Sequence, residues 1–386
     1  MFLKKTMERN PALIDAAFAL HREGVVLPDT YLLDLDMFRI NARLMLEKAE
    51  EEGIRLFFML KQLGRNPFLA KELMRMGYPG AVAVDFREAL LYIENEIPLC
   101  NVGHLVQVPK ALIRTIVAAR PEIITVFTWE KLREIDQAAA ELGVVQDVML
   151  KVAGSDDLFY SGQCSGIELA DLEAFLERAK SLAHVRINGL TVFPCYLYDA
   201  EAKEIRPTPN AETLKKSVAL LHHAGVDVEQ INAPSTTSIL TLKRMKEEIG
   251  NTGEPGHGFT ATTPAHADLD LPERPAIVYL SEVSHTFRGM SYCYGGGYYR
   301  RSHVKEALVE DRHGRHMVGV HPPEMDSIDY YFGLEGMEEI SAPVLMAFRY
   351  QIFVSRSRLA IIEGIQSGTP RFVGMYDALG REINKR

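Results

Sequence analysis

The sequence predicts an α/β fold, a (β/α)8 TIM-like barrel followed by an antiparallel β domain. Short apolar runs alternate with helix-like segments from about residue 36 to 257, and several of those segments end in Gly, a common helix stop. Nearly continuous apolar runs are typical of parallel strands that are covered on both faces. After residue 275, runs rich in β-branched and aromatic residues are separated by Gly and Pro, which indicates antiparallel strands.

Eight strand–helix units are expected in the barrel. The expected strands cover residues 55–60, 81–84, 99–103, 123–128, 148–153, 187–193, 229–233 and, more weakly, 252–256. The clearest helix-like segments between them are at 67–77, 109–120 and 213–225.

The chain is expected to divide into three parts. Residues 1–35 form an N-terminal helix and strand, and the strand at 30–36 (TYLLDLD) joins the β domain. Residues 36–270 form the barrel, and residues 271–386 form the C-terminal β domain. The expected β runs lie at 276–287, 291–301, 316–322, 343–365 and 370–377.

The composition narrows the function classes. The formal net charge of −9 argues against nucleic acid or an anionic membrane as a partner. No signal peptide or membrane span is expected. The four cysteines form no CxxC pair and the histidines show no metal spacing, so we expect a cytoplasmic protein without a metal site.

Lys61 ends the first apolar run, which reads IRLFFMLK. A buried ammonium group is costly without a partner, so this lysine either reaches solvent at the rim or serves as a reactive amine. In a barrel of this type, the C-terminal ends of the strands face the active site. Lys61 is therefore a candidate active-site amine.

The loops after the seventh and eighth expected strands have the composition of a phosphate site. Residues 233–238 (APSTTS) supply the hydroxyls of Ser235 and Thr236, and residues 253–261 supply backbone N–H groups around Gly256 and His257. A reactive lysine opposite such loops predicts pyridoxal 5′-phosphate (PLP), which forms a Schiff base with the amine and takes up carbanion charge. Taken alone, each of these loops is a turn more often than a phosphate site, so the prediction rests on Lys61 and both loops together.

With these features in order, the chain resembles the fold-type III PLP enzymes of the alanine racemase group over nearly its whole length. LDLDMFRINARLM, FFMLKQLGR and VMLKVAG resemble the family's first segment, lysine strand and supporting-lysine strand. The stretch 276–301 resembles the one that leads to the catalytic tyrosine, which implies that role for Tyr294. EMDSID resembles the segment that meets the substrate carboxylate, which implies Met325 and Asp326 there.

The chain also departs from the alanine racemases. Glu254 stands in a loop similar to the EPGR loop of the fold-type III decarboxylases, where a carboxylate would keep the pyridine nitrogen protonated. No arginine follows Lys151 where alanine racemases keep one. Phe193, from GLTVFPCY, takes the place of the ring-stacking histidine. The decarboxylases' CDxxD-like signature is absent, although Cys293 lies beside Tyr294.

The resemblance implies an amino-acid racemase or epimerase, with Lys61 and Tyr294 as bases on opposite faces of the α-carbon. A homodimer with a composite active site is expected. A PLP-dependent decarboxylase or aldolase is the alternative favoured by Glu254, and a non-catalytic PLP-binding protein is a third. Simpler explanations stay open: an aromatic glycine-rich hairpin at Tyr294, a helix-capping turn at Glu254, and a turn after Pro322–Pro323 for Met325 and Asp326.

Overall fold

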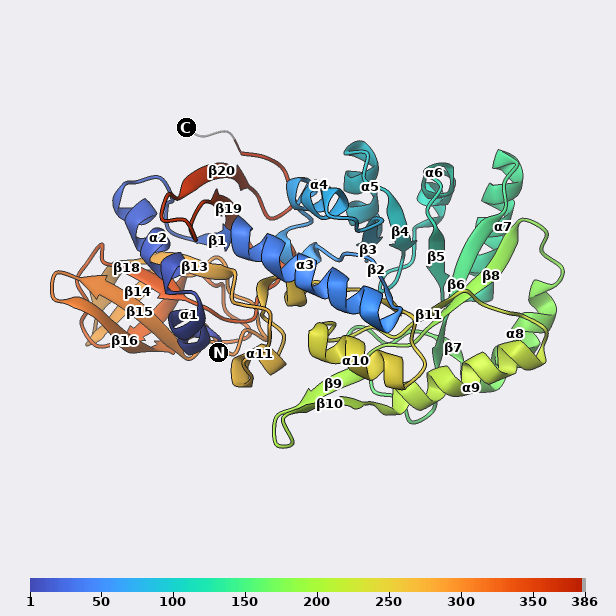
Figure 1. The fold of residues 1–386 in the computed structure, drawn as a ribbon. Helices are drawn as coiled ribbons and strands as arrows, with labels where there is room; N and C mark the ends of the chain where they lie inside the picture. The colour runs from blue at the N-terminus through green and yellow to red at the C-terminus, as the bar shows by residue number, and fades with distance from the viewer. Residues whose placement is uncertain (384–386) are drawn as a thin grey trace. The chain divides into compact units, whose positions relative to one another are not determined.

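The computed structural model describes residues 1–383, which form two compact units (Figure 1). The first unit contains residues 1–44, 61–66 and 257–383, and the second contains residues 45–60 and 67–256. Helix α3 (Leu35–Glu52) continues in sequence from one unit into the other.

The second unit is built on a parallel sheet with the strand order β2-β12-β11-β8-β6-β5-β4-β3. A parallel bridge between Phe58 and Ala81 joins the two ends of this order, together with a hydrogen bond from Val82 N–H to the Phe58 carbonyl. The sheet therefore closes as a barrel. Its strands are β2 (Arg55–Leu56), β3 (Ala81–Ala83), β4 (Leu99–Val102), β5 (Ile123–Val126), β6 (Gln146–Ala153), β8 (Val185–Thr191), β11 (Gln230–Asn232) and β12 (Thr252–Gly253).

Helices follow most of these strands, as the sequence pattern predicts. They are α4 (Pro67–Arg75), α5 (Phe86–Glu94), α6 (Ile113–Ala118), α7 (Trp129–Leu142), α8 (Leu172–Ala179), α9 (Pro209–His223) and α10 (Ile239–Glu247). Short elements complete the unit: β7 (Ile167–Glu168), η2 (Lys110–Leu112), η3 (Leu169–Asp171) and the hairpin β9 (Tyr196–Asp199) with β10 (Glu204–Pro207).

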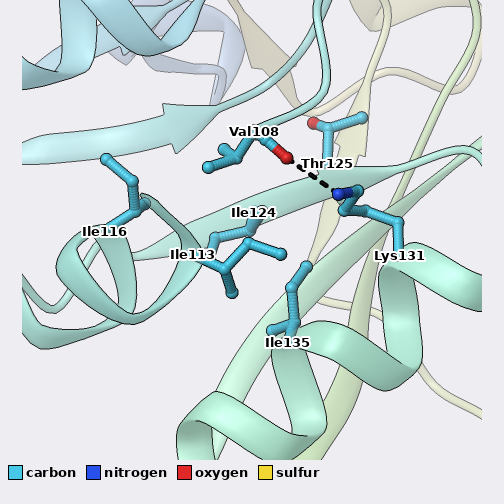
Figure 2. Close-up of a pocket in the computed structure, with 7 residues that line it drawn as sticks. All are labelled: Val108, Ile113, Ile116, Ile124, Thr125, Lys131 and Ile135. Carbon is cyan, nitrogen blue, oxygen red and sulfur yellow. Dashed lines mark hydrogen bonds between the residues drawn. The ribbon is translucent and has the colours of Figure 1, made fainter. Parts of the chain in front are cut away.

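Helix α7 shows how local sequence sets these boundaries. The Thr128 side chain accepts a hydrogen bond from Lys131 N–H at the start of the helix, and Gly143 ends it at a φ of 66°. The Lys131 ammonium donates to the Val108 carbonyl at 2.8 Å, beside the apolar contact between α6 and α7 (Figure 2). The Thr128 cap, the Gly143 terminus and the hydrogen bond from Lys131 together fix the position of α7.

The first unit is built on an antiparallel sheet with the order β14-β17-β16-β15-β18-β13-β1-β19-β20, in which β14 also pairs with β13. Strand β1 pairs antiparallel with β13 and parallel with β19. The N-terminal segment therefore contributes a strand to the C-terminal sheet. The strands are β1 (Thr30–Asp34), β13 (Ile277–Phe287), β14 (Met290–Tyr294), β15 (Glu306–Asp311), β16 (Gly314–His321), β17 (Tyr331–Glu335), β18 (Pro343–Met346), β19 (Arg358–Glu363) and β20 (Arg371–Tyr376).

Helices α1 (Leu3–Arg9) and α2 (Pro11–Arg22) pack apolar side chains such as Leu3, Leu13 and Phe18 into a core shared with β1, β13 and β19. The Asn10 side chain caps α2 by accepting from Leu13 N–H. The remaining short elements of this unit are η1 (Lys61–Leu63), η4 (His257–Thr260), α11 (Ala265–Asp268) and η5 (Ile352–Val354).

The predicted barrel followed by an antiparallel β domain is confirmed, and a parallel strand overlaps each of the eight expected runs. Strands β15 and β17 and the β9-β10 hairpin were not predicted. The domain boundaries expected at residues 35 and 270 stay a prediction. Within residues 1–383, no helix has the length and apolar character needed to span a bilayer.

Candidate cofactor and substrate site

Glu254 is held rigidly inside the barrel by two amide side chains. Its Oε1 accepts hydrogen bonds from Asn101 Nδ2 at 3.0 Å and Asn232 Nδ2 at 2.8 Å. Asn101 in turn accepts from the Thr125 hydroxyl at 2.7 Å. Buried polar groups of this kind are stable only when hydrogen bonded, so the network fixes both the position and the rotamer of Glu254.

The strand register explains why these residues meet. Asn101 lies on β4 and Asn232 on β11, which are not neighbours in the sheet, so their shared contact with Glu254 crosses the barrel interior. On β6, Lys151 is paired with Thr191 of β8, and Thr191 is paired with Asn232. Directly paired residues point to the same face of a sheet. Lys151 therefore points into the interior that also contains Glu254.

The Lys151 side chain is fully buried. Its ammonium donates to the Ser165 hydroxyl at 2.9 Å and lies 5.2 Å from the ring centre of Phe127 and 5.8 Å from that of Phe193. Burial lowers the pKa of Lys151 to about 8, and the charge of Glu254 opposes part of that shift. This amine titrates near neutral pH.

Phe193 is half-buried and packs edge-on against two other rings. Its centroid lies 5.6 Å from that of His104 and 5.6 Å from that of Tyr160. The His104 ring approaches Glu254, with 3.9 Å between Nε2 and Oε2. The aromatic rings of His104, Phe193 and Tyr160 therefore pack together next to Glu254. That Phe193 covers a cofactor ring stays a prediction.

The predicted phosphate loop has a backbone that suits anion binding. Ser235 and Thr236 both have positive φ values, 122° and 48°, which are rare for residues other than Gly. The Thr241 hydroxyl holds the loop by donating to the Thr236 carbonyl at 2.6 Å. The Thr236 hydroxyl oxygen is buried, and residues 1–383 supply it with no hydrogen-bond partner. Such a hydroxyl fits a phosphate oxygen.

His257 is the first residue of η4 in the first unit, and both of its ring nitrogens have hydrogen-bond partners. Nδ1 pairs with the Thr262 hydroxyl at 2.9 Å, and Nε2 pairs with the Gln351 side-chain nitrogen at 3.2 Å. Burial first, and then the positive charges of Arg349 and Lys61, hold the pKa of His257 well below its usual value. The ring is therefore neutral, and only the backbone of this residue suits the predicted phosphate contact.

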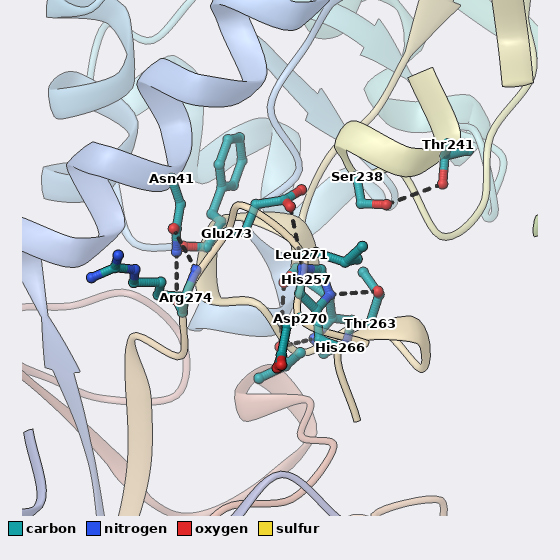
Figure 3. A network of polar contacts seen from close by, with 12 residues as sticks. Asn41, Ser238, Thr241, His257, Thr263, His266, Asp270, Leu271, Glu273 and Arg274 are labelled. Carbon is teal, nitrogen blue, oxygen red and sulfur yellow. Dashed lines mark hydrogen bonds and ion pairs between the residues drawn. The ribbon is translucent and has the colours of Figure 1, made fainter. Parts of the chain in front are cut away.

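The segment after His257 is fixed from within the first unit. Asn41 donates to the carbonyls of Phe259 at 2.9 Å and Arg274 at 2.8 Å, which clamps both ends of the segment. Figure 3 shows this clamp and, nearby, the buried His266, which lies 3.5 Å from a Glu273 carboxylate oxygen. These contacts give η4 a defined place in its unit.

Lys61 opens η1, two residues after Met59, whose N–H still pairs with the Pro255 carbonyl. The segment 61–66 packs within the first unit. A Cβ on Gly64, whose φ is 69°, would lie only 3.3 Å from the Asp377 carbonyl oxygen. The Arg65 guanidinium lies 5.1 Å from the Phe353 ring centre. The predicted active-site lysine is thus carried by a tightly packed turn.

Tyr294 ends β14, where it is paired with Tyr331 of β17. The Tyr294 side chain is 37% exposed, and no residue in the described chain forms a hydrogen bond with its hydroxyl. The turn that contains Met325 and Asp326 leads into β17, and Met325 is 65% exposed. All three predicted side chains therefore lie at the surface of the first unit, where their assigned roles stay predictions.

Cys293, next to Tyr294, is fully buried, and burial raises the pKa of its thiol to about 12. This thiol stays protonated at neutral pH and does not offer the reactive thiolate that the decarboxylase alternative would use. Among residues 1–383, no group of three or more His, Cys, Asp or Glu side chains is placed to hold a metal ion.

Sequence reasoning missed the residues that hold Glu254. Asn101 and Thr125 each stand alone as a polar residue within an apolar strand, as in LCNVG and IITVF, while Asn232 shares its short strand with Gln230 in QINA. A lone polar residue at a core-facing strand position needs a buried partner, so this signal was present in the sequence.

Comparison with known proteins identifies the family. Residues 33–264 match the family described as "Alanine racemase, N-terminal domain", and residues 278–372 match the one described as "YhfX-like, C-terminal domain". The chain belongs to the alanine racemase N-terminal domain family. The family's cofactor is PLP, as the sequence predicts, and its members use amino-acid substrates and are typically dimeric.

The chain is also similar to individual proteins. It is 42% identical to "Uncharacterized protein YhfX" from Escherichia coli (strain K12), over 99% of this chain and 100% of that protein. D-threonine aldolase from Filomicrobium marinum has a similar fold, with a TM-score of 0.68 at 18% identity over 92% of this chain and 96% of that one. An alanine racemase of Clostridium difficile 630 has a TM-score of 0.62 at 14% identity, over 91% and 98%. At these identities the two structures show the fold alone.

Proposed function

We propose that the protein is a PLP-dependent enzyme that acts at the α-carbon of a free amino acid, as a racemase or epimerase. The observation that carries the PLP-dependent chemistry is Glu254, held inside the barrel by Asn101 and Asn232, and the choice of a racemase rests on the resemblance that implies Lys61 and Tyr294 as its two bases. A buried carboxylate in a fixed position suits a partner that carries a proton, and the ring nitrogen of PLP is such a partner.

Each residue then has a defined task. Bound PLP would supply an electron-withdrawing ring that stabilises negative charge at the α-carbon. Lys61 holds the cofactor covalently and takes or returns the α-proton on one face, and the Tyr294 hydroxyl does so on the other. Glu254 keeps the proton on the ring nitrogen. Ser235, Thr236 and the backbone at Gly256 and His257 bind the phosphate.

A PLP lyase is the second candidate, either a decarboxylase or an aldolase. It is favoured by Glu254-Pro255-Gly256, a loop similar to that of the fold-type III decarboxylases, and by the fold shared with a D-threonine aldolase. The buried thiol of Cys293, protonated at neutral pH, weighs against a decarboxylase that needs a reactive cysteine.

One assay separates the candidates. The PLP-loaded protein is incubated in deuterated water with a pool of L-amino acids and, separately, with a pool of D-amino acids, followed by chiral analysis and mass spectrometry. We expect one or more amino acids to change configuration and gain one deuterium at the α-carbon. A shorter product establishes the lyase instead. A pool that stays unchanged, without deuterium uptake, contradicts both enzymes and supports a PLP-binding protein without turnover.

Thr236→Ala is expected to weaken PLP binding. A hydrogen bond to a charged group contributes roughly 1.5–3 kcal/mol, so the dissociation constant should rise about tenfold or more. Equilibrium dialysis measures the change. Ser217→Ala is the matched control, because the Ser217 hydroxyl is buried in the same unit but donates within α9 to the Thr213 carbonyl. Equal PLP affinity in both variants would remove Thr236 from the site.

We further propose a homodimer in which Tyr294 acts on the partner subunit's cofactor. The exposed Tyr294 side chain and the largely exposed 322–329 turn support this arrangement. Mixing inactive Lys61→Ala and Tyr294→Phe proteins, under conditions that exchange subunits, should restore activity, because each heterodimer regains one intact site. Mixtures that stay inactive while mass spectrometry shows heterodimers would refute a shared site.

The state of the four cysteine thiols supports a proposal for the cell compartment. All four cysteines lack disulfide bonds, and three of them are buried. Unpaired thiols persist in a reducing compartment, so we place the enzyme in the cytoplasm. Activity that is equal with and without a reductant such as dithiothreitol is consistent with this placement.

A further inference from the structure

Lys151 has more hydrogen-bonding capacity than its surroundings use. An ammonium group carries three N–H donors, and within the described chain its nitrogen makes one hydrogen bond, to Ser165. No carboxylate oxygen of residues 1–383 lies within 4.0 Å of it. The side chain is fully buried, so water does not replace the missing acceptors from bulk solvent.

A buried ammonium with one neutral acceptor is costly unless an anion pairs with it. The rings of Phe127 and Phe193 offset only part of this cost. Lys151 is also the one buried lysine or arginine among the described residues of the second unit. Lys151 is therefore the cationic side chain that would pair with an anion bound inside this barrel.

Charge balance indicates which anion this is. Under the proposed function, the negative charge of Glu254 is matched by the protonated ring nitrogen, which leaves the Lys151 charge unmatched. An amino acid bound to the cofactor through its amine brings one further charge, its α-carboxylate. We propose that the Lys151 ammonium binds the α-carboxylate of the amino-acid substrate. This inference rests on the proposed function and names the group that recognises its substrate class.

The pH dependence provides a test that needs no variant. Burial lowers the pKa of Lys151 to about 8, and the charge of Glu254 opposes part of that shift. Lys151 is therefore a cation below pH 8 and becomes neutral as the pH rises through that value. Preference for ligands that carry a carboxylate should be present below pH 8 and should fall above it.

The experiment compares amino acids with the amines that lack only the carboxylate. The pairs are alanine with ethylamine, serine with ethanolamine, and lysine with cadaverine, with both enantiomers of each amino acid. Dissociation constants come from the absorbance change of the bound PLP, so turnover is not needed. In the wild type, at least one amino acid should bind more tightly than its amine, by roughly 10- to 100-fold.

Lys151→Met should remove that preference while PLP stays bound, because Met fills the space without the charge. Lys131→Met is the matched control. Lys131 is a lysine of the same unit that donates to the Val108 carbonyl and to Glu134, outside the barrel interior. The control should keep the wild-type preference. If Lys151→Met does not fold, the fall in the wild-type preference through pH 8 decides the question.

The outcomes distinguish this inference from the proposed function. A Lys151→Met protein that still prefers amino acids, or a wild-type preference that is constant through pH 8, overturns the role of Lys151 alone. A Lys151→Met protein that binds PLP itself more weakly, whichever ligand is present, assigns Lys151 to an oxygen of the cofactor. That outcome also overturns the proposed contact with the substrate carboxylate. A wild type whose spectrum responds to no amino acid overturns the proposed function and this inference together.

Discussion

Borohydride reduction of the PLP-loaded protein is expected to attach the cofactor permanently to Lys61. This lysine opens a packed turn immediately after the extended segment that pairs with the Pro255 carbonyl through Met59. Peptide mass mapping should find the pyridoxyl mass on the peptide that contains Lys61. Lys61→Ala should carry no label and should exchange the α-proton roughly 10²–10⁴-fold more slowly, the usual contribution of a positioned acid–base group.

Lys151 is the most informative control for this experiment. Burial lowers the pKa of Lys151 to about 8, and a neutral amine reacts readily with an aldehyde. Lys151→Met should keep the label on Lys61. A pyridoxyl mass on the peptide that contains Lys151 in the wild type would reverse the two assignments and the proposed mechanism with them.

The strand pattern of the barrel could be predicted because its strands are buried on both faces. Residues 81–84 and 123–128 are nearly continuous apolar runs, and both fold as parallel strands. Even the weak run at 252–256 contains β12, which is only two residues long. Strands β15 and β17 were missed because charged ends and a glycine interrupt their patterns, and pairing with neighbouring strands decides their state.

The polar interior could be predicted only in part. Glu254 was found because its loop resembles that of the fold-type III decarboxylases, and Lys151 was noticed only because VMLKVAG resembles the family's supporting-lysine strand. That Asn101 and Asn232 hold one oxygen of Glu254 depends on the register of strands that are more than 100 residues apart in sequence. A single sequence shows that each strand carries a polar residue, but it does not show which of them face one another.

Glu254→Gln is expected to slow α-proton exchange severely while PLP stays bound. The glutamine oxygen can still accept from Asn101 and Asn232, so the position of the side chain should not change. Its charge is lost, and a neutral amide does not hold a proton on the ring nitrogen. Loss of one preorganised charge-stabilising group typically costs roughly 10²–10³-fold in rate. Deuterium uptake at the α-carbon measures the loss, and equilibrium dialysis checks that PLP is retained.

The matched control for this change is Glu122→Gln. Glu122 is a carboxylate of the same unit that pairs with Arg55 and accepts from Gln230, and its charge is partly exposed to solvent. Removing that charge should change stability slightly and leave the exchange rate unaltered, because surface ion pairs contribute at most about 1 kcal/mol. If the Glu254→Gln protein exchanges the α-proton as fast as the Glu122→Gln control, Glu254 is a structural member of the amide network. The proton on the ring nitrogen would then need another partner, and the electrostatic basis of the proposed reaction would be wrong.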